Sequence, residues 1–494
     1  MTELTETKPI NMPDSTPAGS DLSETYVYRM LSGHLEDRYI WVPGVSWHHW
    51  DGTRWEPVSN ENVREAGVQW VREQYEFAKV TCEHVEDWEK YQRKTKVDTL
   101  LTLAKGVLEV RASELDSDPD LLNCANGTVD LRTGELRQHD PRDYITKTSG
   151  HAYTPGACHD DWDKALEAVP EDVRDWVQVK FGQGITGHTP DEDRIVFLNG
   201  GGANGKSTIV AAIGNAIGDY YHVVAPRALL GDGRTHTTEL ADFRGARFAV
   251  LEELPDKGLS VTRVKNLAGT PKITARHIAK DSIVFDATHT MFVTTNHYPA
   301  ITETDHGTWR RLALVRFPYR FVADPDPDVS NQRQGDRGLR QRITEGNESF
   351  AETVLAWLVE GARTWYDAGQ ITPELPQRIA DDTMTWRTEN DVVLRFWNDC
   401  LESAPGVFTP SADLYLAYTL WAERNNLQAM PDRAFLLKFG AHEVTEEHGV
   451  TKGQNRTGNL NVSRHPESGT LPKVARGWHG IALMQPQSQH LLMA

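Results

Sequence analysis

The sequence predicts an α/β protein whose core is a parallel β-sheet with a glycine-rich loop after one of its strands. A short apolar run, 195–198, passes through a glycine-rich loop into an apolar helical stretch, 209–217. Further predicted strands follow at 247–254 and 288–296. Strands that alternate with helices favour a parallel sheet. We therefore expect the core to occupy residues 191–320.

Length and composition limit the kind of protein. The 494 residues favour about three domains, at roughly 150 residues each, and the 39% hydrophobic and 25% charged content is typical of a soluble globular chain. The formal net charge of −19 excludes attachment to nucleic acid by bulk charge, although a local basic surface remains compatible with it. The four cysteines form no CxxC pair, which argues against a zinc ribbon and suits a reducing cytoplasm. No apolar run approaches the roughly 18 residues of a membrane span, so we expect a soluble intracellular protein.

Changes in composition divide the chain into six predicted segments. The first 21 residues are rich in Thr, Pro and Asp and should be disordered. Turn-forming Pro-Gly and Asp-Gly pairs in a tryptophan-rich stretch, followed by helical spacing, predict a mainly helical N-terminal α+β region. The predicted segments are a tail (1–21), an N-terminal α+β domain (22–117), a segment before the core (118–190), the core (191–320), an acidic linker with a helical lid (321–389) and a C-terminal helix-plus-wing module (390–494).

The glycine-rich loop fits the pattern G-x-x-x-x-G-K-[ST] between a strand and a helix, which is the context that gives this pattern its meaning. Its glycines let backbone N–H groups point at phosphates, and the helix N-terminus favours an anion. Lys206 would bridge the β- and γ-phosphates, and the Ser207 hydroxyl would bind Mg²⁺. The alternative is an ordinary glycine-rich turn with a surface lysine. The predicted nucleotide-binding residues are Gly200, Gly201, Gly202, Ala203, Asn204, Gly205, Lys206, Ser207 and Thr208.

Polar residues follow the next two predicted strands. Glu252 and Glu253 end one strand, where a carboxylate can lie beside Mg²⁺ or polarise an attacking water. We favour Glu253 as the base and Glu252 beside the metal; the alternative is that both cap an exposed strand end. Asn296 ends the other strand and could hydrogen-bond the γ-phosphate or the water, or could be a turn residue.

The segment 257–280 carries six Lys and Arg residues and no acidic residue. Its composition predicts a hairpin between 273–278 and 283–285, with Lys280 near the tip. Lys272, Arg276 and Lys280 would contact DNA phosphates without reading base sequence. The alternative is a solvated positive face.

Arg310 and Arg311 precede the last predicted strand of the core, 312–315. An arginine in this position can reach the triphosphate of an adjacent subunit, where such a finger is worth about 10³–10⁵ in rate. A surface salt bridge, the alternative, is worth at most about 1 kcal/mol.

The order of these elements resembles the superfamily 3 helicases, in the phage and plasmid replication group that also includes the poxvirus-type primase-helicases. The resemblance covers roughly 40–485. The matching segments, in order, are LLNCANGTVDLRTGELRQHDPRDYITK, GGGANGKST, RFAVLEEL, VKNLAGTPKITARHIAK, FVTTNHYP and DHGTWRRLALVRF.

The resemblance implies an AAA+-like ATPase core that uses ATP and Mg²⁺ and assembles into a hexameric ring on DNA. It implies that Lys206 and Ser207 bind ATP and Mg²⁺, that Glu252 and Glu253 form the acidic pair, and that Asn296 is a polar sensor. It favours Arg311 over Arg310 as the trans-acting finger and assigns Lys280 to the hairpin that lines the channel. It also identifies 118–190 as a helicase-associated segment.

Two features depart from, or extend, the resemblance. No hydrophobic-D-x-D strand lies before the helicase-associated segment, and the aspartates of 324–328 alternate with prolines, which is typical of a linker. We therefore predict no primer synthesis, and a separate primase or polymerase as partner. The C-terminal region resembles a winged-helix module; residues 449–481 carry a net charge of +4, which suits DNA phosphates, or the module is a structural cap.

The leading hypothesis is an ATP-dependent replicative DNA helicase of a phage or similar mobile element, located in the cytoplasm of a bacterial host. One alternative is a non-motor P-loop ATPase that loads other proteins or packages DNA. The other is a DNA-binding replication initiator whose nucleotide only promotes assembly.

Overall fold

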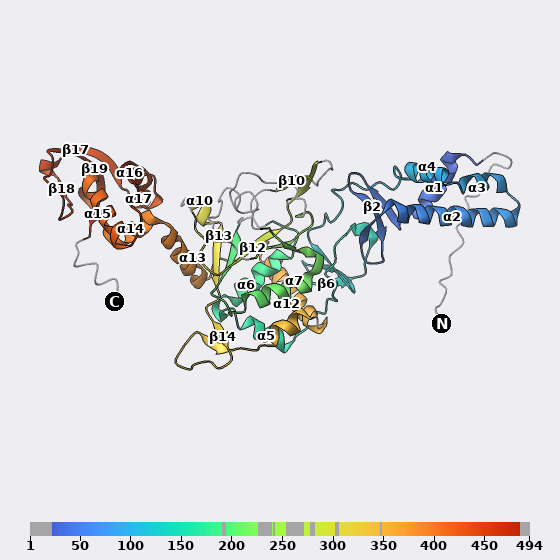
Figure 1. Ribbon diagram of the computed structural model, residues 1–494, viewed down its shortest axis with the longest axis horizontal. Coiled ribbons are helices and arrows are strands. Elements are labelled where there is room, and N and C mark those ends of the chain that lie inside the picture. The colour runs from blue at the N-terminus through green and yellow to red at the C-terminus, as the bar shows by residue number, and fades with distance from the viewer. Residues whose placement is uncertain are drawn as a thin grey trace. The chain divides into compact units, whose positions relative to one another are not determined.

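In the computed structural model, the described residues are 22–189, 194–225, 240, 243–252, 271–276, 282–301, 306–345 and 348–484 (Figure 1). The chain forms two compact units. The first comprises Met1–Asp118 with Gln138–Lys147, and the second comprises Pro119–Arg137 with Thr148–Ala494. Among the described helices, none has the length and apolar character that crossing a membrane requires.

The first unit combines helices with a small antiparallel sheet. Ser23 and Ser59 cap the first and second helices, because each side-chain oxygen accepts from a backbone N–H of the first turn. Gly67 lets the second helix, α2 (Asn60–Thr81), approach the fourth, α4 (Lys94–Ala104), closely, since a Cβ there would lie 3.2 Å from Val97 Cγ1. The elements are α1 (Glu24–Leu35), β1 (Tyr39–Val42), β2 (Ser46–Trp50), β3 (Trp55–Val58), α2 (Asn60–Thr81), α3 (Val85–Tyr91), α4 (Lys94–Ala104) and the 3₁₀ turn Pro141–Asp143.

The second unit is built on a five-stranded, wholly parallel sheet in the order β13-β7-β12-β9-β8. The strands are β7 (Ile195–Asn199), β8 (Tyr221–Val223), β9 (Phe248–Leu251), β12 (Thr290–Thr295) and β13 (Leu312–Arg316). All five are short, and the four other than the edge strand β8 are almost wholly buried, as expected for a parallel sheet that is covered on both faces. The predicted parallel α/β core is confirmed.

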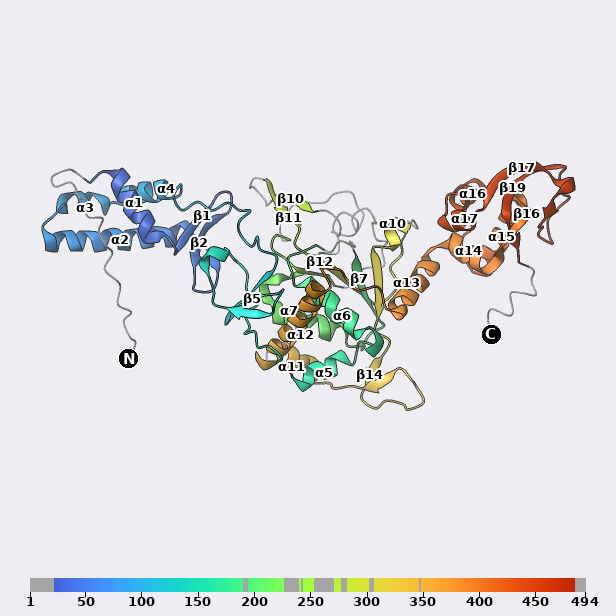
Figure 2. The ribbon, with the colours of Figure 1, turned by 180° about the vertical axis from the view of Figure 1, so that it is seen from behind.

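Alternate residues of each strand point to opposite faces and join two separate cores. Val196, Val250 and Phe292 pack on one face with the helices α6 (Glu171–Gly184), α7 (Lys206–Ile217) and α12 (Glu348–Asp367), which lie beside the sheet in Figure 2. Phe197 and Val293 pack on the other face with Trp386. Trp386 belongs to helix α13 (Gln377–Asn390). The same helix also contacts the sheet by a hydrogen bond, in which Leu314 N of β13 donates to Thr383 Oγ1.

Helices α6 and α12 touch through two glycines. A Cβ on Gly182 would lie 2.2 Å from Ala362 N, and one on Gly361 would lie 2.2 Å from Gln178 O. The two backbones are therefore too close for any larger residue at either position.

Smaller elements surround this core. They are β4 (Leu121–Cys124), β5 (Gly127–Asp130), β6 (Glu135–Arg137), α5 (Asp160–Leu166), the 3₁₀ turn Gly218–Tyr220, β10 (Lys272–Arg276), β11 (Ser282–Asp286), α10 (His306–Trp309), β14 (Arg320–Val322), β15 (Gln332–Gln334) and α11 (Leu339–Thr344). The antiparallel pairing of β10 with β11 confirms the predicted hairpin. The stretch 321–336, which the sequence presents as a linker, contributes the parallel pair β14–β15.

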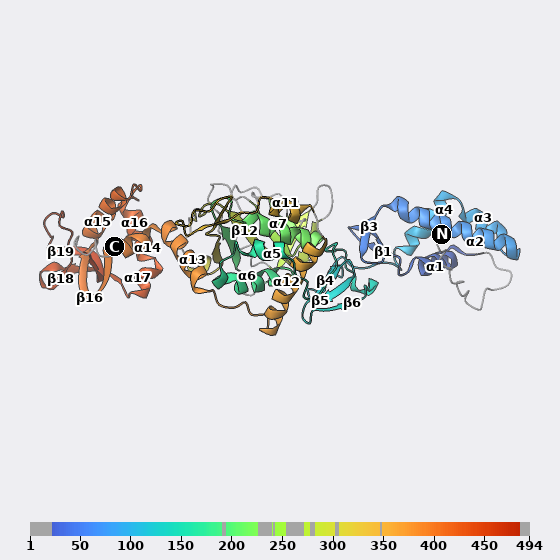
Figure 3. The ribbon, with the colours of Figure 1, turned by 90° about the horizontal axis from the view of Figure 1, so that it is seen from below.

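The C-terminal part of the second unit packs four helices on a four-stranded sheet of order β17-β19-β16-β18. Figure 3 shows β16, β18 and β19 side by side. The elements are α14 (Val392–Cys400), β16 (Leu401–Pro410), α15 (Ser411–Arg424), α16 (Asp432–Gly440), α17 (Glu443–Glu447), β17 (Thr451–Arg456), the 3₁₀ turn Thr457–Asn459, β18 (Asn461–Val462) and β19 (Val474–Leu483).

Candidate functional site

The glycine-rich loop connects β7 to α7 and turns through the left-handed region of backbone space. Gly202, Ala203 and Gly205 have φ values of 62°, 51° and 82°. Glycine adopts these angles at no steric cost, whereas Ala203 stores backbone strain. Such strain persists only where the surrounding structure fixes the loop in one shape.

The loop also folds back on its first residue. A Cβ on Gly200 would lie 1.9 Å from Asn204 Nδ2 and 2.8 Å from Phe317 O. Asn204 is 5% exposed, and within the described residues its buried Nδ2 has no hydrogen-bond partner. A buried donor without an acceptor is costly, and a bound anion would satisfy it.

Lys206 is 5% exposed, and its ammonium lies between two oxygens. Nζ donates to Gly200 O at 2.8 Å and to Asn296 Oδ1 at 2.9 Å. The sheet explains the second contact, because β12 lies beside β7 with Thr295 opposite Asn199. Asn296 therefore leaves its strand level with Gly200. The structure brings together the loop lysine and the asparagine that the sequence analysis singled out.

Glu252 follows β9 at the same edge of the sheet, on the far side of β12. Tyr221 Oη donates to Glu252 Oε1 at 3.0 Å. Burial raises the pKa of Tyr221, and the negative charge of Glu252 raises it further. The hydroxyl therefore stays protonated at neutral pH and orients the carboxylate. Glu253 lies outside the described residues.

A cavity of about 560 Å³ opens on the Asn296 side of the loop. It includes Arg316, which ends β13 opposite Asn199 and whose Nη1 lies 4.0 Å from Asp382 Oδ1. Arg316 did not stand out in the sequence; the available signal was its position at the carboxyl end of an apolar run. The cavity is lined by Asn199, Gly200, Gly201, Gly202, Asn204, Asn296, His297, Tyr298, Arg316, Phe317, Pro318, Tyr319, Arg320, Asn331, Thr385 and Glu389.

Arg310 and Arg311 lie at the opposite end of the same strand. Leu312 pairs with Ile195, so both arginines precede the amino end of β13. Arg311 Nη1 donates to Gly307 O at 2.9 Å. Neither arginine is brought to the Lys206 loop of its own chain.

The predicted DNA-contacting residues fall on the β10–β11 hairpin. Lys272 Nζ lies 3.1 Å from Asp286 Oδ1, directly across the hairpin. This pair partly neutralises the positive charge that the sequence suggested. Arg276 ends β10, and Lys280 lies outside the described residues.

Three families match successive parts of the chain. The family described as "D5 N terminal like" matches residues 28–177. A family of unknown function matches 198–311, which includes the glycine-rich loop. The family described as "Poxvirus D5 protein-like" matches 388–464.

Several viral proteins are similar in sequence. "Putative primase C962R" of African swine fever virus is 27% identical over 329 residues, which is 63% of this chain and 34% of that protein. "Putative helicase L207/L206" of Acanthamoeba polyphaga mimivirus is 25% identical over 353 residues, 67% of this chain and 36% of that protein. The chain thus spans about a third of the length of these relatives.

Among solved structures, the C-terminal region of NrS-1 is similar with a TM-score of 0.46 and 8% identity, over 92% of this chain and 98% of that one. The two D5 families match at both ends of the chain, and the viral relatives match across much of it. These matches support a primase-helicase family of the superfamily 3 type.

Proposed function

We propose that this chain is the ATP-hydrolysing motor part of a replicative DNA helicase. The observation that carries the proposal is the placement of the Lys206 ammonium between Gly200 O and Asn296 Oδ1 at the carboxyl edge of a parallel sheet. Ligands of open α/β sheets bind at this edge. The relatives named as helicases support the same role.

The chain's own residues account for binding of the triphosphate. Phosphate oxygens would replace Gly200 O and Asn296 Oδ1 as partners of the ammonium, and would accept from the unsatisfied Asn204 Nδ2. The positive end of α7 favours the same negative charge. Arg316 enters the same cavity and would face the γ-phosphate from β13.

The donor set also fits Mg²⁺. Mg²⁺ prefers oxygen ligands and commonly takes one or two carboxylates together with substrate phosphates and water. Ser207 and Glu252 would supply the protein oxygens, and the described residues hold no cluster of three or more acidic, His or Cys side chains that would bind a metal without the nucleotide. Bound there, Mg²⁺ would neutralise charge on the phosphates. Glu253 remains our proposed base.

We assign Arg311, with Arg310 next, to a neighbouring subunit's triphosphate, in a hexameric ring with an AAA+-like core. The position of both arginines at the amino end of β13 supports this assignment, because a group that acts in trans has no need to reach its own loop. A mobile element as source and a bacterial host remain proposals, and the viral relatives named above point to a viral replication setting.

DNA would contact two antiparallel strand pairs. One is β10–β11, with Lys272, Arg276 and Lys280. The other is β17–β19 of the winged-helix-like C-terminal part. Lys452, Gln454 and Arg456 are every second residue of β17, so their side chains lie on one face of the sheet. Arg476 of β19 lies opposite Gln454 and therefore on the same face, so the three cations share one exposed face. None of the three makes an ion pair within the described residues.

Strand displacement on forked DNA tests the proposal. The full chain should separate the strands with ATP and Mg²⁺ but not with a non-hydrolysable analogue, and Lys206→Ala should abolish both hydrolysis and unwinding. ATP turnover without unwinding would favour the loader or packaging ATPase. Nucleotide-dependent DNA binding without turnover would favour the initiator. Primer synthesis by the purified chain would contradict our prediction that it has no primase activity.

A further inference from the structure

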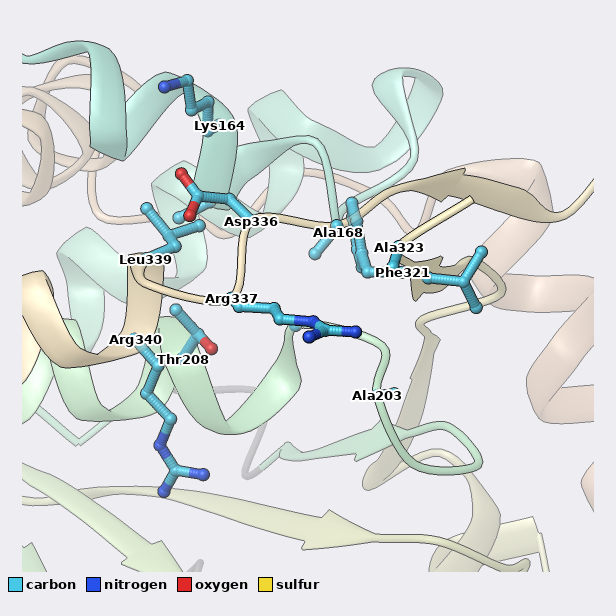
Figure 4. A pocket seen from close by; sticks show the side chains of 14 residues that line it. Lys164, Ala168, Ala203, Thr208, Phe321, Ala323, Asp336, Arg337, Leu339 and Arg340 are labelled. Carbon is cyan, nitrogen blue, oxygen red and sulfur yellow. The ribbon is translucent and has the colours of Figure 1, made fainter. Parts of the chain in front are cut away.

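A second cavity, of about 250 Å³, lies against the phosphate loop (Figure 4). Its walls come from α5, the loop and first turn of α7, β14 and the segment that leads into α11. It is lined by Lys164, Ala165, Ala168, Ala203, Gly205, Thr208, Phe321, Val322, Ala323, Gly335, Asp336, Arg337, Leu339 and Arg340.

The phosphate loop separates the two cavities. Its first residues, 200–202, and Asn204 line the larger cavity on the Asn296 side. Ala203, Gly205 and Thr208 line the smaller one. A molecule held by the loop can therefore extend into both cavities at once.

The larger cavity is mainly polar and the smaller one mainly apolar. A nucleotide shows the same difference between its charged phosphates and its weakly polar base. The larger one presents amides, His297 and Arg316, which suit a triphosphate. The smaller one has mainly alkyl and aromatic walls, including Ala168, Phe321 and Leu339. A flat, weakly polar base with its ribose suits such walls, because ligand pockets are mostly apolar with a few polar groups.

Two cations stand at the smaller cavity without a carboxylate partner. Arg337 and Arg340 make no ion pair within the part of the chain that the structure describes, whereas the nearby Asp336 is held by Arg342 at 2.7 Å. In Figure 4 the Arg337 side chain reaches across the cavity toward β14. A guanidinium can stack on a base, and so can a phenyl ring such as that of Phe321.

The wall and the loop are also joined directly, since Phe321 N donates to Ala203 O at 2.8 Å. We propose that the smaller cavity binds the base and ribose of the nucleotide whose phosphates lie at Lys206, with Phe321 and Arg337 contacting the base. This inference rests on the proposed function, because it assumes that the loop holds a triphosphate.

Calorimetric titration of the full chain with two probes tests the inference. The probes are the β,γ-imido analogue of ATP and inorganic tripolyphosphate, both with Mg²⁺. Ala323 is exposed, so Ala323→Trp should fill the cavity without disturbing the core. Ala323→Trp and Arg337→Ala should each weaken the analogue by roughly 5- to 150-fold, the range of base stacking, and leave tripolyphosphate binding unchanged. Val329→Trp, an exposed site on the same connection that does not line the cavity, is the matched control.

The outcomes separate the two proposals. If Lys206→Ala abolishes binding of the ATP analogue but Ala323→Trp and Arg337→Ala leave its affinity unchanged, the base site is overturned and the proposed function stands. If Ala323→Trp lowers the affinity for both probes equally, the result for Arg337→Ala determines whether the base site stands, because this substitution only removes atoms. An equal loss of affinity for both probes in Arg337→Ala overturns the base site. A wild-type chain that binds neither probe, or whose binding survives Lys206→Ala, overturns both proposals.

Discussion

Arg342 holds the carboxylate of Asp161 through two hydrogen bonds of 2.8 Å, from Nε to Oδ2 and from Nη2 to Oδ1. Asp161 belongs to α5 and Arg342 to α11, so the pair joins two helices that wall the smaller cavity. Asp161 is 8% exposed. A carboxylate this deeply buried depends on its partner, because an unpaired buried charge is costly.

This pair predicts a pH dependence of stability. The hydrogen bond from Arg342 lowers the pKa of Asp161 and also that of Asp336. A carboxyl whose folded pKa lies below its unfolded value, about 3.9, stabilises the fold above that pH and loses this contribution as the pH falls through the folded pKa. The urea midpoint of the wild type should therefore exceed that of Arg342→Gln near neutral pH, and the gap should close below about pH 4. A gap that stays constant in acid would contradict the assignment.

Mixing of variants should distinguish an arginine that acts in trans from one that acts in cis. Arg311→Ala should reduce ATP turnover by about 10³–10⁵ while nucleotide binding stays near normal. A mixture of Arg311→Ala with Lys206→Ala should regain activity, because some shared sites would combine an intact loop with an intact Arg311. The measurement is steady-state ATP hydrolysis at a fixed total protein concentration.

Arg316 provides the matched control for this experiment. It lies at the cavity of its own chain, so a mixture of Arg316→Ala with Lys206→Ala should stay inactive: every site lacks one of the two groups. Recovery in the Arg316 mixture would contradict the role in cis that we propose for Arg316, and no recovery in the Arg311 mixture would contradict the role in trans that we propose for Arg311.

The exposed cations of the β17–β19 strand pair should set the salt dependence of DNA binding. Each lost phosphate contact reduces the slope of log K against log salt by about 0.9 for duplex DNA. Lys452→Ala with Arg476→Ala should therefore reduce the slope by about 1.8. Gln454→Ala, on the same face of this strand pair, should leave the slope unchanged. An unaltered slope in the double variant would exclude this face from DNA binding.

The close approach of α6 and α12 predicts that even one added methyl group between them lowers the stability of the fold. Gly361→Ala would place a methyl group within 2.2 Å of Gln178 O. Such overpacking typically costs about 1–3 kcal/mol, so thermal unfolding of the second unit should occur at lower temperature. Gly33→Ala, in helix α1 where an added Cβ would meet no atom within 4 Å, should leave stability unchanged or raise it. An unchanged melting temperature for Gly361→Ala would show that the helices separate easily.

The sequence predicted the parts of the site that depend on local pattern. The loop, the strand before it and the helix after it follow from glycine spacing and apolar runs. Arg316 was missed because its importance depends on strand register, which pairs it with Asn199 and which a single sequence does not reveal. The paired arginines at 310–311 were conspicuous in sequence, yet register places them at the other edge of the sheet.

The smaller cavity could not be predicted for a related reason. The prolines and aspartates of 321–336 are typical of a linker, and only the long-range pairing of β14 with β15 makes this stretch a wall. Glu253 and Lys280 lie outside the described residues and stay predictions.

The glycine-rich loop lies between the two cavities. The residues that would select the nucleotide are therefore separate from those that would hydrolyse it. The first set lies mainly in 321–340, and the second at the ends of strands. A smaller side chain in the cavity wall, as in Leu339→Ala, would then make room for an ATP analogue with an enlarged purine. The residues proposed to act in hydrolysis would be unchanged. Such a variant would offer chemical-genetic control, in which an enlarged analogue drives one engineered copy alone.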